Sequence, residues 1–315
     1  MPAGWSFRWI EVCTLASGVP LRVAVHEIEG ATDGPCLGVS ALIHGDEVTG
    51  PEVVRRLRDF VDPATLRGRL RLVPVANPLA FQTLTRGTPL AVEIGNLNRV
   101  FPADPSLDLP ARLAHALEAE FLEEVTHLVD LHAGGTFPIV DYGISLRDVE
   151  MALAFGQRVV REVKGYAGTM GALAAAQGKP SFVAEIGGGY ALDGDYIEMG
   201  LRGVANVMRH LKMIDGRLER PRQQIVITEV ATLRPGHGGL LHSQMGPQVM
   251  GREVTKGTLL GRIISPHTFE TLEELRAPFA RSVVLLLRSG ITAVNPGDYG
   301  YMLGNMDGAR HVTHS

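Results

Sequence analysis

The sequence predicts an α/β fold in which a mostly parallel, mixed sheet is flanked by helices and followed by a smaller all-β, barrel-like domain. Two observations predict it. Strand-like apolar runs alternate with helical patterns up to about residue 213, which is typical of a sheet covered by helices on both faces. Beyond residue 214 the helical signal nearly stops, and short apolar runs alternate with Gly and Pro. We therefore expect an α/β domain over residues 1–213, a β domain that caps it over 214–303, and a polar tail over 304–315.

The strands of the first domain are predicted from two kinds of apolar pattern. Residues 21–28 alternate in hydrophobicity, as a half-buried strand does, whereas residues 36–43 form a continuous apolar run, as a strand covered on both faces does. Similar patterns predict further strands at 7–13, 70–76, 127–131 and 181–186. Helical periodicity predicts helices at 50–60, 109–122, 149–163 and 195–213, and a long polar loop is expected at 82–105.

The C-terminal region is predicted to contain short strands at 224–232, 239–242, 259–264 and 282–287. Residues 251–298 resemble a biotinyl- or lipoyl-type barrel. A carrier of that kind needs a lysine at the hairpin between its two halves, but residues 264–283 contain none, and Lys256 lies in the first turn. We therefore interpret this region as a cap over the first domain and not as a swinging arm.

Composition excludes several classes of protein. With 315 residues, 45% hydrophobic and 20% charged, the chain can bury a sizeable core and is not expected to be disordered. Its longest apolar stretch falls far short of the ~20 residues of a membrane span. A net charge of −4 offers no global basic field for nucleic acid. Two cysteines, Cys13 and Cys36, exclude a disulfide framework, and the first residues lack a secretory pattern, so we expect a cytoplasmic protein.

The pattern His-x-x-Glu, which can supply two metal ligands, occurs four times, so context must decide between the occurrences. His44 and Glu47 stand just after the apolar run 36–43, at the carboxyl end of a predicted strand, where open α/β sheets build their sites. The other pairs fall within a strand, on a solvated helix face or in a polar loop: His26/Glu29, His115/Glu118 and His267/Glu270. We therefore take His44 and Glu47 as candidate ligands.

A third ligand is expected from another strand end. His132 follows the apolar strand 127–131 and is followed by Ala-Gly-Gly, although a strand-end histidine can also simply bond to backbone. Two imidazoles and one carboxylate form a zinc site with a position left open for water. Asp130 is a candidate to accept a hydrogen bond from an imidazole ligand and so to fix the orientation of its ring. Glu185, at the end of the apolar strand 181–186, is a candidate general base, the alternative being a structural ion pair.

The polar loop supplies candidate substrate-binding residues. Asn98 and Arg99 offer amide donors and a planar guanidinium, which suit a two-point grip on a carboxylate. Arg86, earlier in the loop, is a candidate to stabilise negative charge on a carbonyl oxygen, although each arginine alone also fits an ordinary surface charge. The absence of a G-x-S-x-G elbow speaks against an α/β-hydrolase.

In combination, these residues resemble the succinylglutamate desuccinylase/aspartoacylase family, relatives of the zinc carboxypeptidases. The matching pieces occur in the family's order between residues 36 and 189: His44-Gly-Asp-Glu47, Ala76-Asn77-Pro78, Asn96-Leu-Asn-Arg99 with Phe101-Pro102, Asp130-Leu-His-Ala-Gly-Gly135, and Glu185.

The resemblance implies one zinc ion on His44, Glu47 and His132, and Glu185 as general base. It also implies that Asn98 and Arg99 clamp the substrate carboxylate, with Arg86 a looser match. Asp46 stands where the family often has Asn, and His237 and Tyr299 are candidates for a cap residue that reaches the site.

The leading hypothesis is a zinc-dependent amidohydrolase that removes a short acyl group from an N-acyl amino acid. Its partner is then a small-molecule substrate, and neither nucleic acid nor a membrane is expected as a partner. Whether the protein forms a homo-oligomer stays an open question. One alternative is a zinc carboxypeptidase acting on small peptides, and another is a non-catalytic metal-binding module. Glu185 argues against the last, because binding alone needs no base. The sequence identifies neither the acyl group nor the amino acid.

Overall fold

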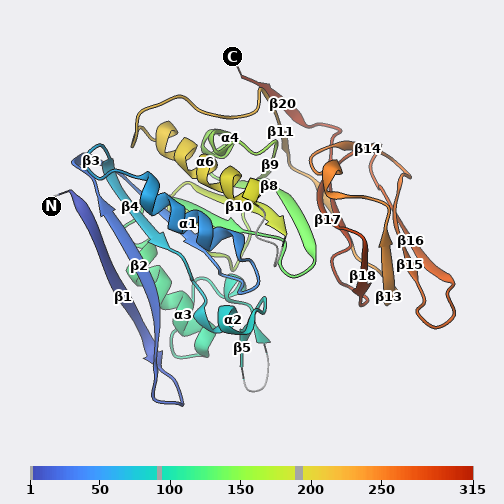
Figure 1. Cartoon of the computed structure of the whole chain (residues 1–315), viewed down its shortest axis with the longest axis horizontal. Helices are drawn as coiled ribbons and strands as arrows, with labels where there is room; N and C mark the ends of the chain where they lie inside the picture. Colours follow the sequence, from blue (N-terminus) through green and yellow to red (C-terminus); the bar gives the residue numbers. More distant parts are fainter. Residues whose placement is uncertain (1–2, 91–93, 189–193, 315) are drawn as a thin grey trace.

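The computed structural model describes residues 3–90, 94–188 and 194–314 (Figure 1). The helices are α1 (Thr49–Phe60), α2 (Pro78–Thr83), α3 (Leu109–Leu117), α4 (Val149–Phe155), α5 (Met170–Ala176) and α6 (Gly194–His210), with short turns η1 (Leu97–Arg99), η2 (Glu118–Leu122) and η3 (Pro247–Val249). The strands of the first part are β1 (Gly4–Thr14), β2 (Pro20–Glu29), β3 (Thr32–Ala41), β4 (Arg67–Val73), β5 (Thr88–Pro89), β6 (Ile94–Gly95), β7 (His127–His132), β8 (Pro138–Leu146), β9 (Val159–Val163) and β10 (Ser181–Gly188). Those of the second part are β11 (Gln223–Ile227), β12 (Val230–Leu233), β13 (Gly239–Ser243), β14 (Glu253–Thr255), β15 (Leu259–Ile264), β16 (Thr271–Arg276), β17 (Arg281–Arg288), β18 (Ile291–Val294), β19 (Tyr301–Asn305) and β20 (Arg310–Thr313).

One large mixed sheet organises the molecule. Its strands follow the order β1-β2-β4-β3-β7-β10-β8-β17-β19-β12. At its centre β4, β3, β7 and β10 run parallel to one another, so their carboxyl ends meet at one edge of the sheet. The predicted α/β class with a mixed sheet and flanking helices is confirmed.

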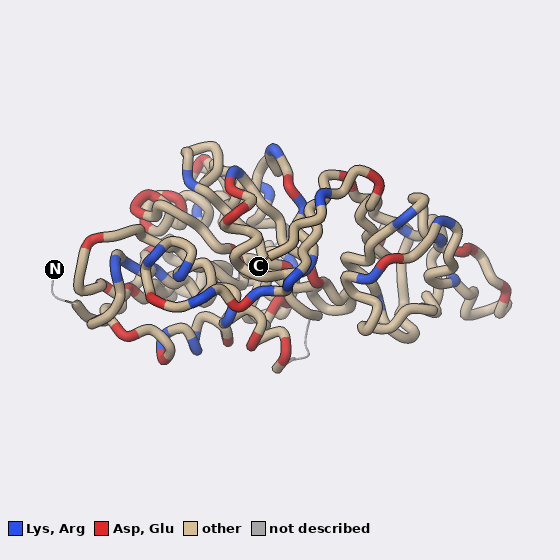
Figure 2. Tube along the Cα trace, turned by 90° about the horizontal axis from the view of Figure 1, so that it is seen from above, with Lys and Arg blue, Asp and Glu red and all other residues tan. Residues whose placement is uncertain are grey.

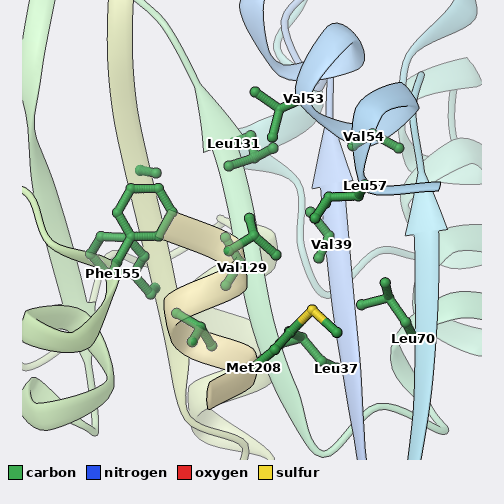
Figure 3. Close-up of a cluster of buried hydrophobic side chains, with 14 of the residues drawn as sticks. Leu37, Val39, Val53, Val54, Leu57, Leu70, Val129, Leu131, Phe155 and Met208 are labelled. Carbon is green, nitrogen blue, oxygen red and sulfur yellow. The ribbon is translucent and has the colours of Figure 1, made fainter. Parts of the chain in front are cut away.

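Helices cover both faces of the central strands. On one face α1, α4 and α6 bury a cluster with the side chains of β3, β4 and β7 that point to that face. Figure 3 shows Leu57 of α1 beside Val39 of β3, and Met208 of α6 beside Leu37 of β3. On the other face α3 and α5 contribute Leu113, Leu117 and Met170 to a second buried cluster. This double cover explains why residues 36–43 are apolar without interruption.

A smaller C-terminal β region is present, as predicted. A four-stranded sheet with the order β16-β15-β13-β18 packs against β17 and β19 of the large sheet. Leu241, Leu260 and Ile263 of the small sheet share a buried cluster with Leu287 and Leu303. In Figure 1 these orange and red strands lie at the end of the molecule opposite to β1.

Two expectations about secondary structure are wrong. The helix expected at 149–163 ends at Phe155, because Gly156 takes a left-handed φ of 102° and the β-branched residues that follow form β9 instead. Residues 138–146, for which no strand was expected, form β8 between β10 and β17.

The polar tail expected at 304–315 is instead largely paired into the sheet, as far as its described residues (304–314) show. Gly304 and Asn305 belong to β19, and Arg310–Thr313 form β20, which pairs antiparallel with β11. These short strands are paired with partners far away in sequence, so local composition does not reveal them.

Charges of both signs are interspersed along the chain trace (Figure 2), in line with the small net charge. Among the described helices, none is long and apolar enough to cross a membrane.

Candidate functional site

The turn after β3 positions the first two candidate ligands. Leu42 adopts a left-handed φ of 54°, and the chain then folds tightly over α2. A Cβ on Gly45 would lie 2.0 Å from the carbonyl carbon of Ala80, so only glycine allows this close approach. Asn77 stabilises the turn by donating to the Ile43 carbonyl and by accepting from the Ala80 N–H. His44 and Glu47 are therefore fixed at the carboxyl edge of the sheet.

His44, Glu47 and His132 form one buried cluster. Nδ1 of His44 lies 2.8 Å from Oε1 of Glu47, and Nδ1 of His132 lies 2.8 Å from Oε2 of the same carboxylate. One potential ligand atom of each residue lies within 4.8 Å of those of the other two, a spacing that can hold a metal ion. All three side chains are at most 4% exposed.

The Nε2 side of His132 is held by a second carboxylate. Oδ2 of Asp130 lies 2.9 Å from Nε2 of His132, and the Ser40 hydroxyl donates to Oδ1 of Asp130 at 2.7 Å. Because Asp130 accepts the Nε2 proton, Nδ1 is the nitrogen left to bind a ligand.

Electrostatics follow from this packing. Burial raises the pKa of Glu47, but His44 and His132 outweigh it, so its pKa lies well below the usual range. Burial lowers the pKa of His132, but Asp130 and Glu47 outweigh it and hold that pKa well above the usual value. Burial lowers the pKa of His44. The cluster thus holds the ionised carboxylate of Glu47 between a neutral His44 ring and a His132 ring that favours its protonated form.

Glu185 lies next to this cluster on β10. It pairs in register with His132 of β7 on one side and with Tyr142 of β8 on the other. Burial, and then the nearby carboxylates of Glu47 and Asp130, raise its pKa to about 7, whereas His132 and Arg86 oppose the shift. A carboxyl group with such a pKa can both accept and release a proton near neutral pH.

The loop residues surround the same cavity. Arg86 donates from Nη1 to Oε1 of Glu47 at 2.9 Å. Asn98 accepts from the Met170 N–H at the start of α5, and its Nδ2 lies 3.4 Å from Nε2 of His132. Asp130 accepts the Nε2 proton of His132, so Nε2 is a donor, and Nδ2 of Asn98 is a donor as well. The two nitrogens therefore do not hydrogen-bond to each other, and Nδ2 of Asn98 can donate to another acceptor. Arg99 donates to the Asn98 carbonyl at 2.6 Å and lines the cavity.

The seven predicted site residues all line this one cavity. Of the two cap candidates, Tyr299 lines the cavity, and Arg234 stacks on its ring at 4.1 Å from the centroid. His237 does not line it; its side chain is 60% exposed and lies 3.5 Å from Glu273. Asp46 accepts from the Thr136 N–H and hydroxyl, and so supports the loop after β7.

Sequence reasoning missed several residues of the cavity. Alternate residues of β8 line it, among them Tyr142 and Ile144, and Arg161 of β9 does so too. The signal for these strands was present in the β-branched pairs Ile139-Val140 and Val159-Val160 and in Gly156 before the second pair.

Comparison with known proteins agrees with this geometry. The model of the succinylglutamate desuccinylase/aspartoacylase catalytic domain matches residues 33–211, which is more than half of the chain. The chain belongs to the succinylglutamate desuccinylase/aspartoacylase family. The matched segment contains the whole set of predicted site residues.

Relatives and solved structures extend the likeness over nearly the whole chain. An N-alpha-acetyl-L-2,4-diaminobutyric acid deacetylase from Halomonas elongata is 26% identical over 283 residues, 84% of this chain and 81% of that protein. An aspartoacylase family protein from Mesorhizobium loti is 26% identical, with a TM-score of 0.81 over 97% of this chain and 95% of that one. The product-bound ectoine utilization protein EutE (DoeB) from Ruegeria pomeroyi shares the fold, with 23% identity and a TM-score of 0.84 over 97% of each chain.

Proposed function

We propose that this family member is a zinc-dependent hydrolase that removes a short acyl group from the nitrogen of an N-acyl amino acid. The observation that carries the proposal is the convergence of His44, Glu47 and His132 with Glu185 in one cavity. The name of the Halomonas elongata relative, a deacetylase, supports the reaction type.

The donor set fits zinc. Two imidazole nitrogens and a carboxylate are the ligands of catalytic zinc sites with an open position, and Asp130 leaves Nδ1 of His132 free for that purpose. Zinc bound there would polarise the acyl carbonyl and lower the pKa of water.

Glu185 is the proposed general base. It takes a proton from the attacking water and delivers it to the amide nitrogen as the C–N bond breaks, so that the amine leaves neutral. Its position beside His132, and a pKa that burial raises to about 7, support this role.

Three side chains are proposed to hold the substrate. Asn98 and Arg99 bind the α-carboxylate; both residues line the cavity, and an amide and a guanidinium are suitable donors to a carboxylate. Arg86, which donates to Glu47 and lines the cavity, stabilises negative charge on the oxygen of the reacting carbonyl.

The C-terminal β region is proposed to limit the size of the substrate. Leu286 of β17, Met302 of β19 and Tyr299 close one side of the cavity. In this proposal residues 1–213 form the hydrolase domain and residues 214–303 form the domain that caps it.

A deacylation screen tests the function. N-acetyl and N-succinyl amino acids are incubated with the protein in the presence of zinc and again after chelation, and the free amine is measured. Zinc-dependent release is expected. Turnover of acyl-dipeptides alone would favour a carboxypeptidase, and zinc binding without any turnover would favour a binding module.

A further inference from the structure

The buried amide of Gln157 joins two strands behind the cavity. Gln157 follows Gly156, the residue that ends α4, and its side chain is 1% exposed. Its Nε2 atom donates to the backbone carbonyl of Glu185 on β10 at 2.8 Å and to Oδ1 of Asp141 on β8 at 3.2 Å. A carbonyl oxygen can only accept a hydrogen bond, so the amide nitrogen of Gln157, and not its oxygen, must face Glu185. The neighbours of the amide therefore fix its orientation.

This contact lies on the face of the sheet opposite to the Glu185 carboxylate. Asp141 pairs in register with Ile186 of β10, whose side chain belongs to the buried cluster under α1, α4 and α6. Neighbouring side chains of a strand point to opposite faces, and Glu185 lines the cavity on the other face. Gly143 of β8 leaves room for the amide, since a Cβ there would lie only 3.2 Å from Oε1 of Gln157. The amide of Gln157 thus reaches the backbone of β10 from behind.

Glu185 is the last residue of β10 that is paired with a regular strand on both sides. On the β7 side the register ends with the pair Glu185–His132, whereas the pairing with β8 continues to Gly188. Beyond this point the Gly134 N–H donates to the carbonyl of Gly187, which adopts a left-handed φ of 81°. Glycines restrain the backbone least, so the end of β10 depends on hydrogen bonds from outside the ladder. The bond from Gln157 is one of these, and it acts at Glu185 itself.

A group that takes a proton from water and delivers it to a substrate nitrogen must be held to within about 0.5 Å. We propose that Gln157 is a positioning residue for the reaction, because it holds the backbone of β10 at Glu185 and so directs the Glu185 carboxylate into the cavity. Gln157 itself is not among the described residues that line the cavity. The inference rests on the proposed function, because it presupposes that Glu185 is the general base.

Gln157→Met tests the proposal, because it removes both hydrogen bonds and nearly preserves the volume of the side chain. On the N-acyl amino acid that wild type hydrolyses best, kcat is expected to fall roughly 10- to 100-fold, the cost of a misplaced catalytic group. KM and zinc content should stay close to wild type, because the substrate-binding and metal-binding side chains are unchanged.

Asn206→Leu is the matched control. Asn206 of α6 is also fully buried, and its Nδ2 atom donates to a backbone carbonyl, that of Glu219, at 2.8 Å. The variant therefore loses a buried amide of the same kind without touching β10. It should lower the free energy of unfolding but keep the kcat of wild type.

A double variant, Asp141→Val with Gln157→Met, separates positioning from stability. Gln157→Met alone removes the hydrogen bond that the buried Asp141 carboxyl accepts, which destabilises the fold. The double variant removes both polar groups, so the free energy of unfolding should return toward that of wild type. The kcat should nevertheless stay low, because no donor replaces Gln157 at the Glu185 carbonyl. Recovery of kcat together with stability would overturn the proposal.

Crystal structures of wild type and of the double variant give a readout that does not depend on turnover. The Glu185 carboxylate is expected to move by roughly 0.5 Å or more relative to the His132 ring. No turnover by wild type, or a wild-type kcat in Glu185→Gln, would refute the proposed function, and a displaced Glu185 would then still support the inference that Gln157 holds this residue. An unchanged Glu185 position, or an unchanged kcat in Gln157→Met beside a low kcat in Glu185→Gln, would overturn the inference and leave the proposed function intact.

Discussion

His132 lies between two carboxylates, and this arrangement gives its two nitrogens different tasks. Asp130 accepts the Nε2 proton, and Nδ1 points to Glu47. Similarly, His44 directs Nδ1 to Glu47 and Nε2 to Oδ1 of Asn96 at 3.2 Å. An acceptor behind each ring selects the tautomer that leaves Nδ1 for an ion, so the three residues are arranged before an ion arrives.

We predict that His44→Ala loses zinc and activity together, because two protein ligands make a weak site. Elemental analysis of the purified variant measures the metal. His115→Ala is the control, since His115 also belongs to a His-x-x-Glu pair but is exposed on α3. Stoichiometric zinc in His44→Ala would show that the ion binds elsewhere.

We predict that Glu185→Gln keeps its zinc and its fold but loses about 10²- to 10⁴-fold in kcat, the usual contribution of a positioned general base. Glutamine has the same shape but cannot accept the proton. Steady-state kinetics and circular dichroism check the two parts. A kcat near that of wild type would leave Glu185 as a structural carboxylate.

At the scale of elements, β8 turns opposite faces to two environments. Its even-numbered residues, such as Tyr142 and Ile144, face the cavity. Asp141 lies on the other face, where the Gln157 amide donates to it at 3.2 Å. Burial raises the pKa of Asp141 to about 6, although the Gln157 hydrogen bond opposes the shift.

This shift predicts a pH-dependent effect of Asp141→Asn on stability. The folded-state pKa lies above the unfolded value of 3.8, so the contribution of Asp141 is fully present below about pH 4 and is lost as pH rises through 6. The variant should therefore raise the free energy of unfolding by about 3 kcal/mol at pH 7 and leave it nearly unchanged at pH 4. Denaturant unfolding of wild type and variant at both pH values measures the change in the free energy of unfolding. An equal change at pH 4 and pH 7 would show that the titration of Asp141 is not its cause.

At the scale of the whole molecule, the C-terminal region joins the first part through the large sheet. β17 pairs antiparallel with β8, and β19 continues the sheet beyond it. Arg288 of β17 donates to the Tyr299 carbonyl at 2.7 Å, and its guanidinium lies over the ring of Phe137 at 5.2 Å from the centroid. The wall of the cavity is thus held against the loop that follows β7.

We predict that Tyr299→Ala shifts the ratio of kcat/KM toward longer acyl chains while zinc content stays constant, because the ring closes one side of the cavity. His237→Ala serves as the control, since that side chain does not line the cavity. The ratio is measured with N-acetyl and N-hexanoyl derivatives of one amino acid. The same ratio in wild type and Tyr299→Ala would contradict the proposed cap.

Local patterns in the sequence were enough to predict the α/β class, the C-terminal β region and the strand ends that bear His44, His132 and Glu185. Strands covered on both faces are continuously apolar, and a polar residue at their carboxyl end stands out against that background. Hydrophobic patterning therefore carried this information without tertiary contacts.

Tertiary structure alone decided the rest. The β-branched pairs in β8 and β9 were too local a pattern to separate these strands from helix or loop. Only the pairing of β8 with β10, and of β9 with β11, defines them. Whether a charged side chain is matched is likewise a property of its neighbours. The sequence does not distinguish Arg86, Arg99 and Arg161. In the folded chain, Arg86 donates to Glu47 and Arg99 donates to the Asn98 carbonyl. The buried Nε of Arg161 has no hydrogen-bond partner among the described residues. Burial and pairing arise from residues distant in sequence, so the sequence alone does not show which of these charges is paired within the protein.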